Sequence, residues 1–151
     1  MIQFKAYTFA ELNTELLYQI ISLRLEVFIM EQNCLYQDCD GKDLQALHLL
    51  GFEENQLVAY CRILPEGISY TGYCSIGRVL TKSSHRGKQY GIALMEKAIR
   101  ICTTEFTFPL KISAQAYLEK FYTNLGFQTV GELYLEDHIP HIGMIYKHRT
   151  T

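Results

Sequence analysis

Residues 76–91 read IGRVLTKSSHRGKQYG, and this stretch decides the fold. Its first six residues are typical of a strand, a short polar loop follows, and the last six open a helix. The first amides of a helix have no acceptor within it, and the helix dipole adds positive potential there, so this geometry suits a pyrophosphate. Arg86 and Lys88 add positive charge, while Gly87 and Gly91 let the backbone approach a ligand closely.

The hydrophobic periods on either side predict alternating strands and helices. The expected elements are a strand over 2–6, a helix from a capping box at Thr8–Glu11 to about Phe28, strands over 46–53, 56–64 and 73–80, a helix over 91–102, a strand over 110–114, a helix over 117–125, and strands over 127–133 and 141–146. This order predicts an α/β protein of the α+β kind, with a central mixed β-sheet flanked by helices.

Turn-forming residues separate these elements. Glu54-Asn55 suits a tight hairpin, Gly126 suits a left-handed helix cap, and residues 136–140 form the turn before the last strand. The polar stretch 32–44 is the longest connection, and we interpret its aspartates as turn formers. His48 lies in an apolar strand and is expected to be a hydrogen-bonded core histidine.

The composition predicts one ordinary globular domain over residues 1–151, because 48% of the residues are hydrophobic and 20% are charged. A net charge of −2 argues against nucleic-acid binding. The sequence has no signal-peptide pattern and no membrane-length apolar run, so we expect a cytoplasmic protein that does not bind a membrane. Five cysteines without a CxxC motif predict reduced thiols and no structural zinc.

The 86–91 loop resembles the acyl-CoA pyrophosphate loop of the GNAT acetyltransferase superfamily. Arg86 and Gly91 match the two ends of that motif, whereas Gln89 stands where the family usually has its first glycine. Four further motifs resemble the ElaA-like branch of the family in order and spacing. These are 27–32 (VFIMEQ), 114–116 (AQA), 121–127 (FYTNLGF) and 136–141 (EDHIPH).

The resemblance implies acetyl-CoA-dependent transfer of an acetyl group to a primary amine by direct attack. It places the acetyl group between strands at 79–81 and 113–114, with its carbonyl against a backbone amide, and Tyr122 beside the sulfur as the acid that protonates the thiolate. The donor-binding residues that it implies are Val79, Leu80, Thr81, Arg86, Gly87, Lys88, Gln89, Tyr90, Gly91, Ala114 and Tyr122.

The acceptor side needs a base, since only a neutral amine is nucleophilic. Glu31, Glu136, Asp137 and His141 are candidates that the sequence leaves unranked. We expect Glu31 and His141, together with Tyr122, to be catalytic. Glu31, Arg78, Glu136 and Asp137 are the candidate acceptor-binding residues, and the acidic ones would attract a cationic amine. The spacing of His138 and His141 in a turn does not suit a metal, so none is expected.

Two alternatives remain open. Residues 23–43 faintly resemble acyl-homoserine-lactone synthases, which use longer acyl donors. The departure at Gln89 also leaves room for a non-catalytic acyl-CoA sensor, in which Tyr122 would be dispensable. The acceptor is a small-molecule or peptide amine of unspecified identity, and the resemblance suggests a homodimer.

Overall fold

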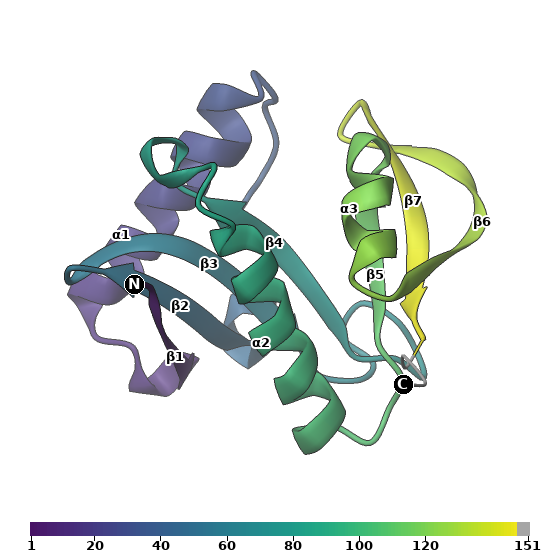
Figure 1. Ribbon diagram of the computed structural model, residues 1–151, viewed down its shortest axis with the longest axis horizontal. Helices are drawn as coiled ribbons and strands as arrows, with labels where there is room; N and C mark the ends of the chain where they lie inside the picture. The colour runs from purple at the N-terminus through teal and green to yellow at the C-terminus, as the bar shows by residue number, and fades with distance from the viewer. Residues whose placement is uncertain (148–151) are drawn as a thin grey trace.

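The structure is a computed structural model that describes residues 1–147. Two antiparallel sheets form its framework (Figure 1). The larger runs in the order β1 (Gln3–Thr8), β2 (Leu47–Glu53), β3 (Gln56–Leu64) and β4 (Ser75–Thr81). The smaller runs in the order β5 (Lys111–Gln115), β7 (Ile139–Tyr146) and β6 (Phe127–Glu136). A parallel bridge between Cys74 and Leu110 links the two sheets, so the whole arrangement is mixed, as expected.

Helices cover both faces of the larger sheet because side chains alternate along its strands. On β3, Cys61 and its odd-numbered neighbours pack in one core cluster with α2 (Tyr90–Glu105). Tyr60 points the other way and packs in a second cluster with α1 (Thr14–Arg24). The sheet therefore has two cores, which together bury most of its apolar side chains.

The beginning of the first helix differs from the prediction. Thr8 and Glu11 do form a reciprocal capping box, but it closes a 3₁₀ turn at Phe9–Glu11. α1 begins afterwards, where the Asn13 side chain accepts a hydrogen bond from the Leu16 amide at 2.7 Å. The capping box at Thr8 forms as predicted, but Asn13, five residues later, is the N-cap residue of the longer helix.

The end of the first helix also differs. The apolar periodicity predicted a continuous α-helix to about Phe28, whereas α1 ends at Arg24 and residues Leu25–Glu31 are π-helical. A π-helical turn is wider, and such turns are frequent at functional sites. Here it carries Glu31 to the edge of the cleft described below.

The hairpin predicted at Glu54-Asn55 is present, and both residues have positive φ, 49° and 66°. The last turn is shorter than predicted. Only Asp137 and His138 form it, with φ of 50° and 67°, so β6 extends to Glu136 and β7 begins at Ile139. Both connections have the backbone twist that favours two-residue hairpins.

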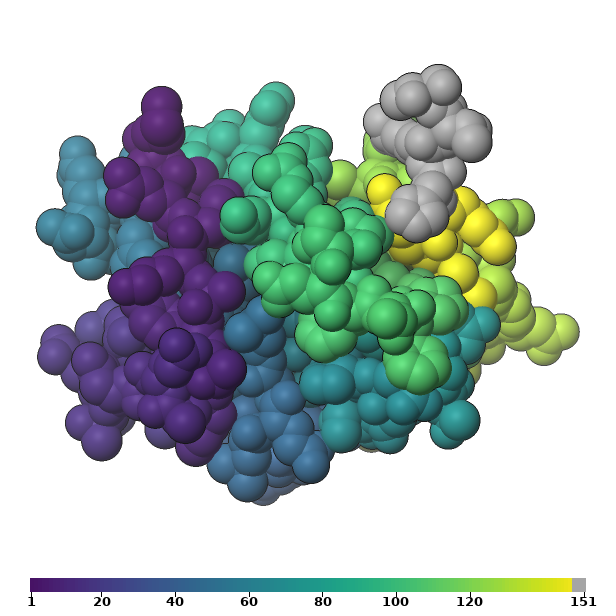
Figure 2. All heavy atoms as spheres, turned by 90° about the horizontal axis from the view of Figure 1, so that it is seen from below, coloured from purple at the N-terminus to yellow at the C-terminus, as the bar shows by residue number. Residues whose placement is uncertain are grey.

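The helix expected over 117–125 is divided into a 3₁₀ turn, Ala116–Leu118, and α3 (Glu119–Asn124). Gly126 follows it with φ of 111°, in agreement with its expected role. Viewed from below, the N-terminal segment and β7 lie on opposite sides of the end of α2 and its following loop (Figure 2). None of the helices within residues 1–147 has the length and apolar character needed to cross a bilayer.

Gly126→Ala is expected to lower the free energy of unfolding by about 1–3 kcal/mol, because an added Cβ would lie 3.0 Å from the Tyr146 ring at a backbone angle that disfavours side chains. Gly77→Ala is the control, since a Cβ there meets no atom within 4 Å. Urea denaturation of both variants checks the prediction, and an equal loss in the two would contradict it.

Candidate functional site

The cleft that forms the candidate site exists because β4 and β5 are hydrogen-bonded at one end only. The Cys74 amide donates to the Pro109 carbonyl at 2.9 Å, and the Lys111 amide donates to the Cys74 carbonyl at 3.0 Å. Beyond this point the two strands diverge (Figure 1). The space between them opens into a cleft of about 1060 Å³.

A bulge in β4 shapes one wall of this cleft. Tyr60 pairs with Leu80 and Arg62 with Gly77, so Arg78 and Val79 together lie opposite Cys61. Arg78 takes a φ of 52°, a conformation that non-glycine residues rarely adopt and that is common at functional sites. The bulge changes the alternation of β4, so that Ile76 packs with the α2 core and Leu80 packs with the α1 core.

Some of the expected donor-binding residues line the cleft and others do not. Those that line it are Val79, Leu80, Thr81, Arg86, Gly91 and Tyr122. Ala114 is 2% exposed and lies outside the lining, as do residues 87–90. The Lys88 ammonium lies 3.3 Å from the Glu53 carboxylate, so its charge is directed to that partner.

The beginning of α2 keeps its amides uncapped by any side chain. Its N-cap residue is Gln89, with φ of 62°, and no side chain accepts a hydrogen bond there. Glycine is therefore not required at position 89 for the chain to turn into the helix, because glutamine itself adopts the left-handed conformation. Uncapped amides at a helix N-terminus favour an anion.

Tyr122 lies at the inner part of the cleft and is 7% exposed. Its ring makes edge contacts with Phe121, at a centroid distance of 5.1 Å, and with Phe127, at 5.9 Å. Burial raises the pKa of the Tyr122 hydroxyl, so the group stays protonated at neutral pH. The side chain is thus a core aromatic that also lines the cleft.

Glu31 and Arg86 both line the cleft, and they pair with each other. The Arg86 Nη2 lies 2.7 Å from the Glu31 Oε2, and the Arg86 Nε donates to the Thr81 carbonyl at 3.0 Å. The two residues lie 55 positions apart in the sequence, and no local sequence pattern predicted their pairing. Glu31 is therefore committed to a cation in this conformation.

His141 has a different environment. Its Nδ1 lies 2.7 Å from the Ile139 carbonyl oxygen, which only accepts hydrogen bonds, so Nδ1 carries the proton. The Glu136 Oε2 lies 3.4 Å from the Nε2. The ring stacks on Tyr134 at 6.1 Å between centroids and is 6% exposed, yet it lines the cleft. Glu136 and Asp137 line the same wall.

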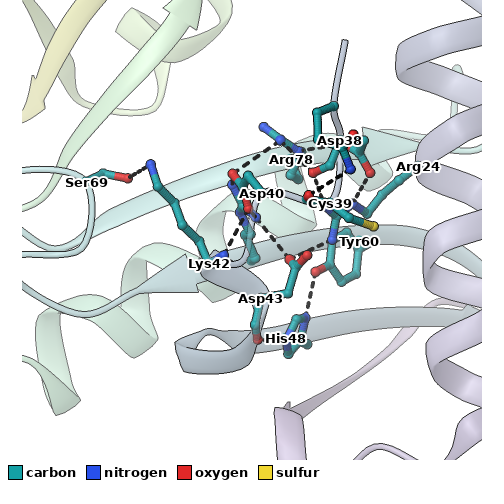
Figure 3. A network of polar contacts seen from close by, with 12 residues as sticks. Arg24, Asp38, Cys39, Asp40, Lys42, Asp43, His48, Tyr60, Ser69 and Arg78 are labelled. Carbon is teal, nitrogen blue, oxygen red and sulfur yellow. Dashed lines mark hydrogen bonds and ion pairs between the residues drawn. The ribbon is translucent and has the colours of Figure 1, made fainter.

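A buried ionic network behind the opposite wall was missed from the sequence (Figure 3). Asp38, whose side chain is 2% exposed, accepts from the Arg24 Nε at 2.9 Å and from the Arg78 Nε at 2.8 Å. Arg62 binds Asp40 with both terminal nitrogens, at 2.6 and 2.8 Å. Asp43 lies between Arg24, at 2.7 Å, and Arg62, at 3.0 Å.

The network explains the irregular stretch 32–44. Its aspartates are ion-pair partners as well as turn formers, which composition alone did not indicate. Burial would raise the pKa of the Asp40 and Asp43 carboxyls, but hydrogen bonds from Arg62 and Arg24 outweigh it and hold both below their usual range. His48 is buried, as expected, with Nδ1 at 2.6 Å from the Tyr60 hydroxyl and Nε2 at 2.9 Å from the Asp43 carbonyl oxygen.

Comparison with known proteins decides the family. Residues 12–148 match the acetyltransferase (GNAT) domain. The chain belongs to the GNAT family. Protein ElaA of Escherichia coli is 43% identical over 147 residues, 95% of each chain. Its crystal structure superposes with a TM-score of 0.90 and 41% identity over 97% of this chain and 100% of that one.

Two further solved structures are similar to this GNAT chain. An acyl-CoA N-acyltransferase from Pseudomonas aeruginosa is 40% identical, with a TM-score of 0.89 over 97% of this chain and 100% of that one. A GNAT family acetyltransferase from Elizabethkingia anophelis, solved with acetyl-CoA bound, shares the fold at 14% identity and a TM-score of 0.65, over 95% and 94% of the two chains. The ElaA-like assignment and the fold class are thus confirmed.

No group of three or more His, Cys, Asp or Glu side chains within residues 1–147 is arranged to hold a metal ion. All five cysteines are free thiols.

Asp38→Asn is expected to lower the free energy of unfolding by about 3–5 kcal/mol, because it leaves the Arg24 and Arg78 guanidiniums without their shared buried carboxylate. Asp137→Asn is the control, since it lies in an exposed turn with positive φ that asparagine accepts, and a change within about 0.5 kcal/mol is expected. Urea denaturation measures both. An equal loss of unfolding free energy in the two variants would show that the ionic network does not stabilise the fold.

Proposed function

We propose that this chain transfers the acetyl group of acetyl-CoA to a primary amine by direct attack. The observation that carries the proposal is the cleft between β4 and β5, which has the uncapped N-terminus of α2 beside it and the Tyr122 side chain within it. A thioester donor needs both an anion site and a proton source for its leaving group. This cleft offers one of each.

The donor half is formed by the bulged end of β4 and the beginning of α2. The amides of α2, supported by Arg86, would hold the pyrophosphate, and a backbone amide within Val79–Thr81 would polarise the acetyl carbonyl. The Elizabethkingia anophelis protein of the same fold was solved with acetyl-CoA bound, which supports acetyl-CoA as the donor. When bound, acetyl-CoA supplies an activated acyl carbon with a thiolate leaving group.

The side chains then move two protons. The base removes one from the ammonium form of the acceptor, so that the amine nitrogen has a lone pair and forms the new C–N bond as the C–S bond breaks. The Tyr122 hydroxyl gives its proton to the departing sulfur and recovers one from the nitrogen. The products are an amide and a free thiol, with one proton released to solvent.

We infer that His141 is this base rather than Glu31. The Glu31 carboxylate is occupied by Arg86 at 2.7 Å, whereas the His141 Nε2 has no lysine or arginine within 4.0 Å among the described residues. The His141 Nε2 keeps a free lone pair in the cleft, and the nearby Glu136 would stabilise the imidazolium after proton transfer. An imidazole also exchanges protons near neutral pH, which suits turnover.

The alternatives from the sequence give different expectations. A longer acyl donor would require the apolar part of the cleft to accept an acyl chain, which donors of graded length test directly. A sensor would bind acyl-CoA but would not need the Tyr122 hydroxyl. A cytoplasmic location fits five free thiols, and it stays a prediction together with the homodimer.

The donor site is tested by calorimetry. We expect saturable binding of acetyl-CoA, weakened about tenfold or more by Arg86→Ala, because a charge-assisted contact to the pyrophosphate is lost. Free CoA and a long-chain acyl-CoA serve as controls for the acyl group. Absence of binding to every CoA species would overturn the proposal, and tighter binding of the long-chain donor would favour the longer-donor alternative.

Turnover separates an enzyme from a sensor. With an amine that the wild type acetylates, Tyr122→Phe and His141→Gln are each expected to lower kcat by about a hundredfold, with acetyl-CoA affinity maintained. His141→Gln should also remove the acidic limb of the pH–rate profile, because a base acts only when unprotonated. If Glu31→Gln removed that limb instead, the base would be Glu31. Unchanged turnover in Tyr122→Phe would contradict its role as the acid.

A further inference from the structure

Two side chains of opposite charge, Lys42 and Glu136, line the same cleft, and within residues 1–147 neither forms an ion pair with a side chain that carries a fixed opposite charge. The Lys42 ammonium donates to the Ser69 hydroxyl at 3.1 Å, and within residues 1–147 no carboxylate lies within 4.0 Å of it. The Glu136 side chain is 52% exposed, and its basic neighbour is His141, whose Nε2 lies 3.4 Å from the Glu136 Oε2. Both residues line the cleft.

The network aspartates do not neutralise Lys42. They are already engaged by Arg24, Arg62 and Arg78, three cations for three carboxylates. In Figure 3 the Lys42 side chain extends away from them toward Ser69. Lys42 therefore adds one uncompensated positive charge to this wall.

Arg78 reinforces the positive wall with a fixed guanidinium. Its Nε and Nη2 donate to the Asp38 carboxylate and carbonyl at 2.8 and 3.0 Å, while its Nη1 has no acceptor among the described residues. The side chain is 19% exposed and lines the cleft. Because the guanidinium is already fixed along one edge, binding of a ligand carboxylate at its other edge costs little further side-chain entropy.

Polar residues next to the two charges also line the cleft. Ser69 contacts Lys42, and Ser69, Tyr70 and Ser113 all belong to the lining. Ser113 lies 3.4 Å from the Glu136 carboxylate. Lys42 and Glu136 therefore border the same cleft.

We propose that the acceptor is a free amino acid, whose carboxylate binds at Lys42 and Arg78 and whose ammonium binds at Glu136 beside His141. This inference rests on the proposed function and names its substrate class. A zwitterion offers a carboxylate to Lys42 and Arg78 and an ammonium to Glu136. A simple amine has only the ammonium, so it can pair only with Glu136. A polyamine places a second cation against Lys42 and Arg78, and a peptide N-terminus has no carboxylate next to its amine.

The site also accounts for the chemistry. Glu136 attracts the ammonium form, His141 Nε2 accepts one of its protons, and the neutral nitrogen attacks the acetyl carbon while the carboxylate stays bound. Atoms and charge balance: the amino acid becomes an N-acetylamino acid, the thioester becomes a thiol, and one proton leaves through His141. No oxidant, reductant or metal enters.

The first test compares kcat/KM of the wild type for matched acceptors. The panel contains the twenty amino acids, the amines formed by their decarboxylation, β-alanine and γ-aminobutyrate for wider spacing, and dipeptides with the same N-terminal residues. We expect at least one amino acid to exceed its decarboxylated amine by about tenfold to a hundredfold, as expected for loss of charge-assisted contacts.

Variants separate the two walls. Lys42→Gln is expected to lower the ratio of amino acid to amine about tenfold, because only the amino acid uses that wall; Lys120→Gln, on the exposed part of α3, should keep the wild-type ratio. Glu136→Gln should weaken both acceptors alike and leave the ratio unchanged, because the ammonium is common to both. Glu132→Gln, exposed on the same strand, is its control.

Each outcome decides a different point. Amines or dipeptides that equal or exceed the amino acids would overturn the inference, and so would an unchanged ratio in Lys42→Gln. Acetyl-CoA binding without acetylation of any amino acid would overturn it too, while the donor site stands. If acetyl-CoA does not bind at all, the proposed function itself fails.

Discussion

The single-ended pairing of β4 and β5 is the constraint on which the rest of the site depends. Hydrogen bonds at Cys74 join the two sheets at one end, and from there the strands separate instead of continuing the ladder. Backbone groups that would pair across a continuous sheet are thereby left facing a cleft. The bulge at Arg78 adds to this effect, because it places two residues of β4 opposite one of β3. A continuous sheet of the same strands would have no space for a ligand between them.

The buried ionic network determines which side chains reach that space. Removing charges from water is costly, so a network of this kind is weak evidence of stability in itself, but it holds its members in one geometry. Asp38 fixes both Arg24 of α1 and Arg78 of β4. The same contacts attach residues 38–43 to the sheet and leave Lys42 directed toward Ser69. The charge pattern of the acceptor wall is therefore a consequence of how the interior is paired.

The two halves of the cleft differ in which groups carry the charge. The donor half relies on backbone amides at α2, supported by an Arg86 that is already paired with Glu31. The acceptor half relies on side chains whose partners are incomplete, Lys42 on one wall and Glu136 on the other. His141 lies at the boundary, with its tautomer set by the Ile139 carbonyl. This arrangement is the basis on which we propose a large anionic donor and a small acceptor that carries both charges.

The sequence by itself determined the order of strands and helices, the Glu54-Asn55 hairpin, the Gly126 cap and the helix entry at 86–91, because each depends on local periodicity or on the φ preference of one or two residues. It did not reveal the π-helical turn after Arg24 or the shorter turn at Asp137-His138, since packing against distant strands overrides propensity at element ends. Only the tertiary structure decided the partners of the charged residues. Glu31 meets Arg86 across 55 positions and Asp38 meets Arg78 across 40, and such pairs arise from the path of the chain, which local patterns do not encode.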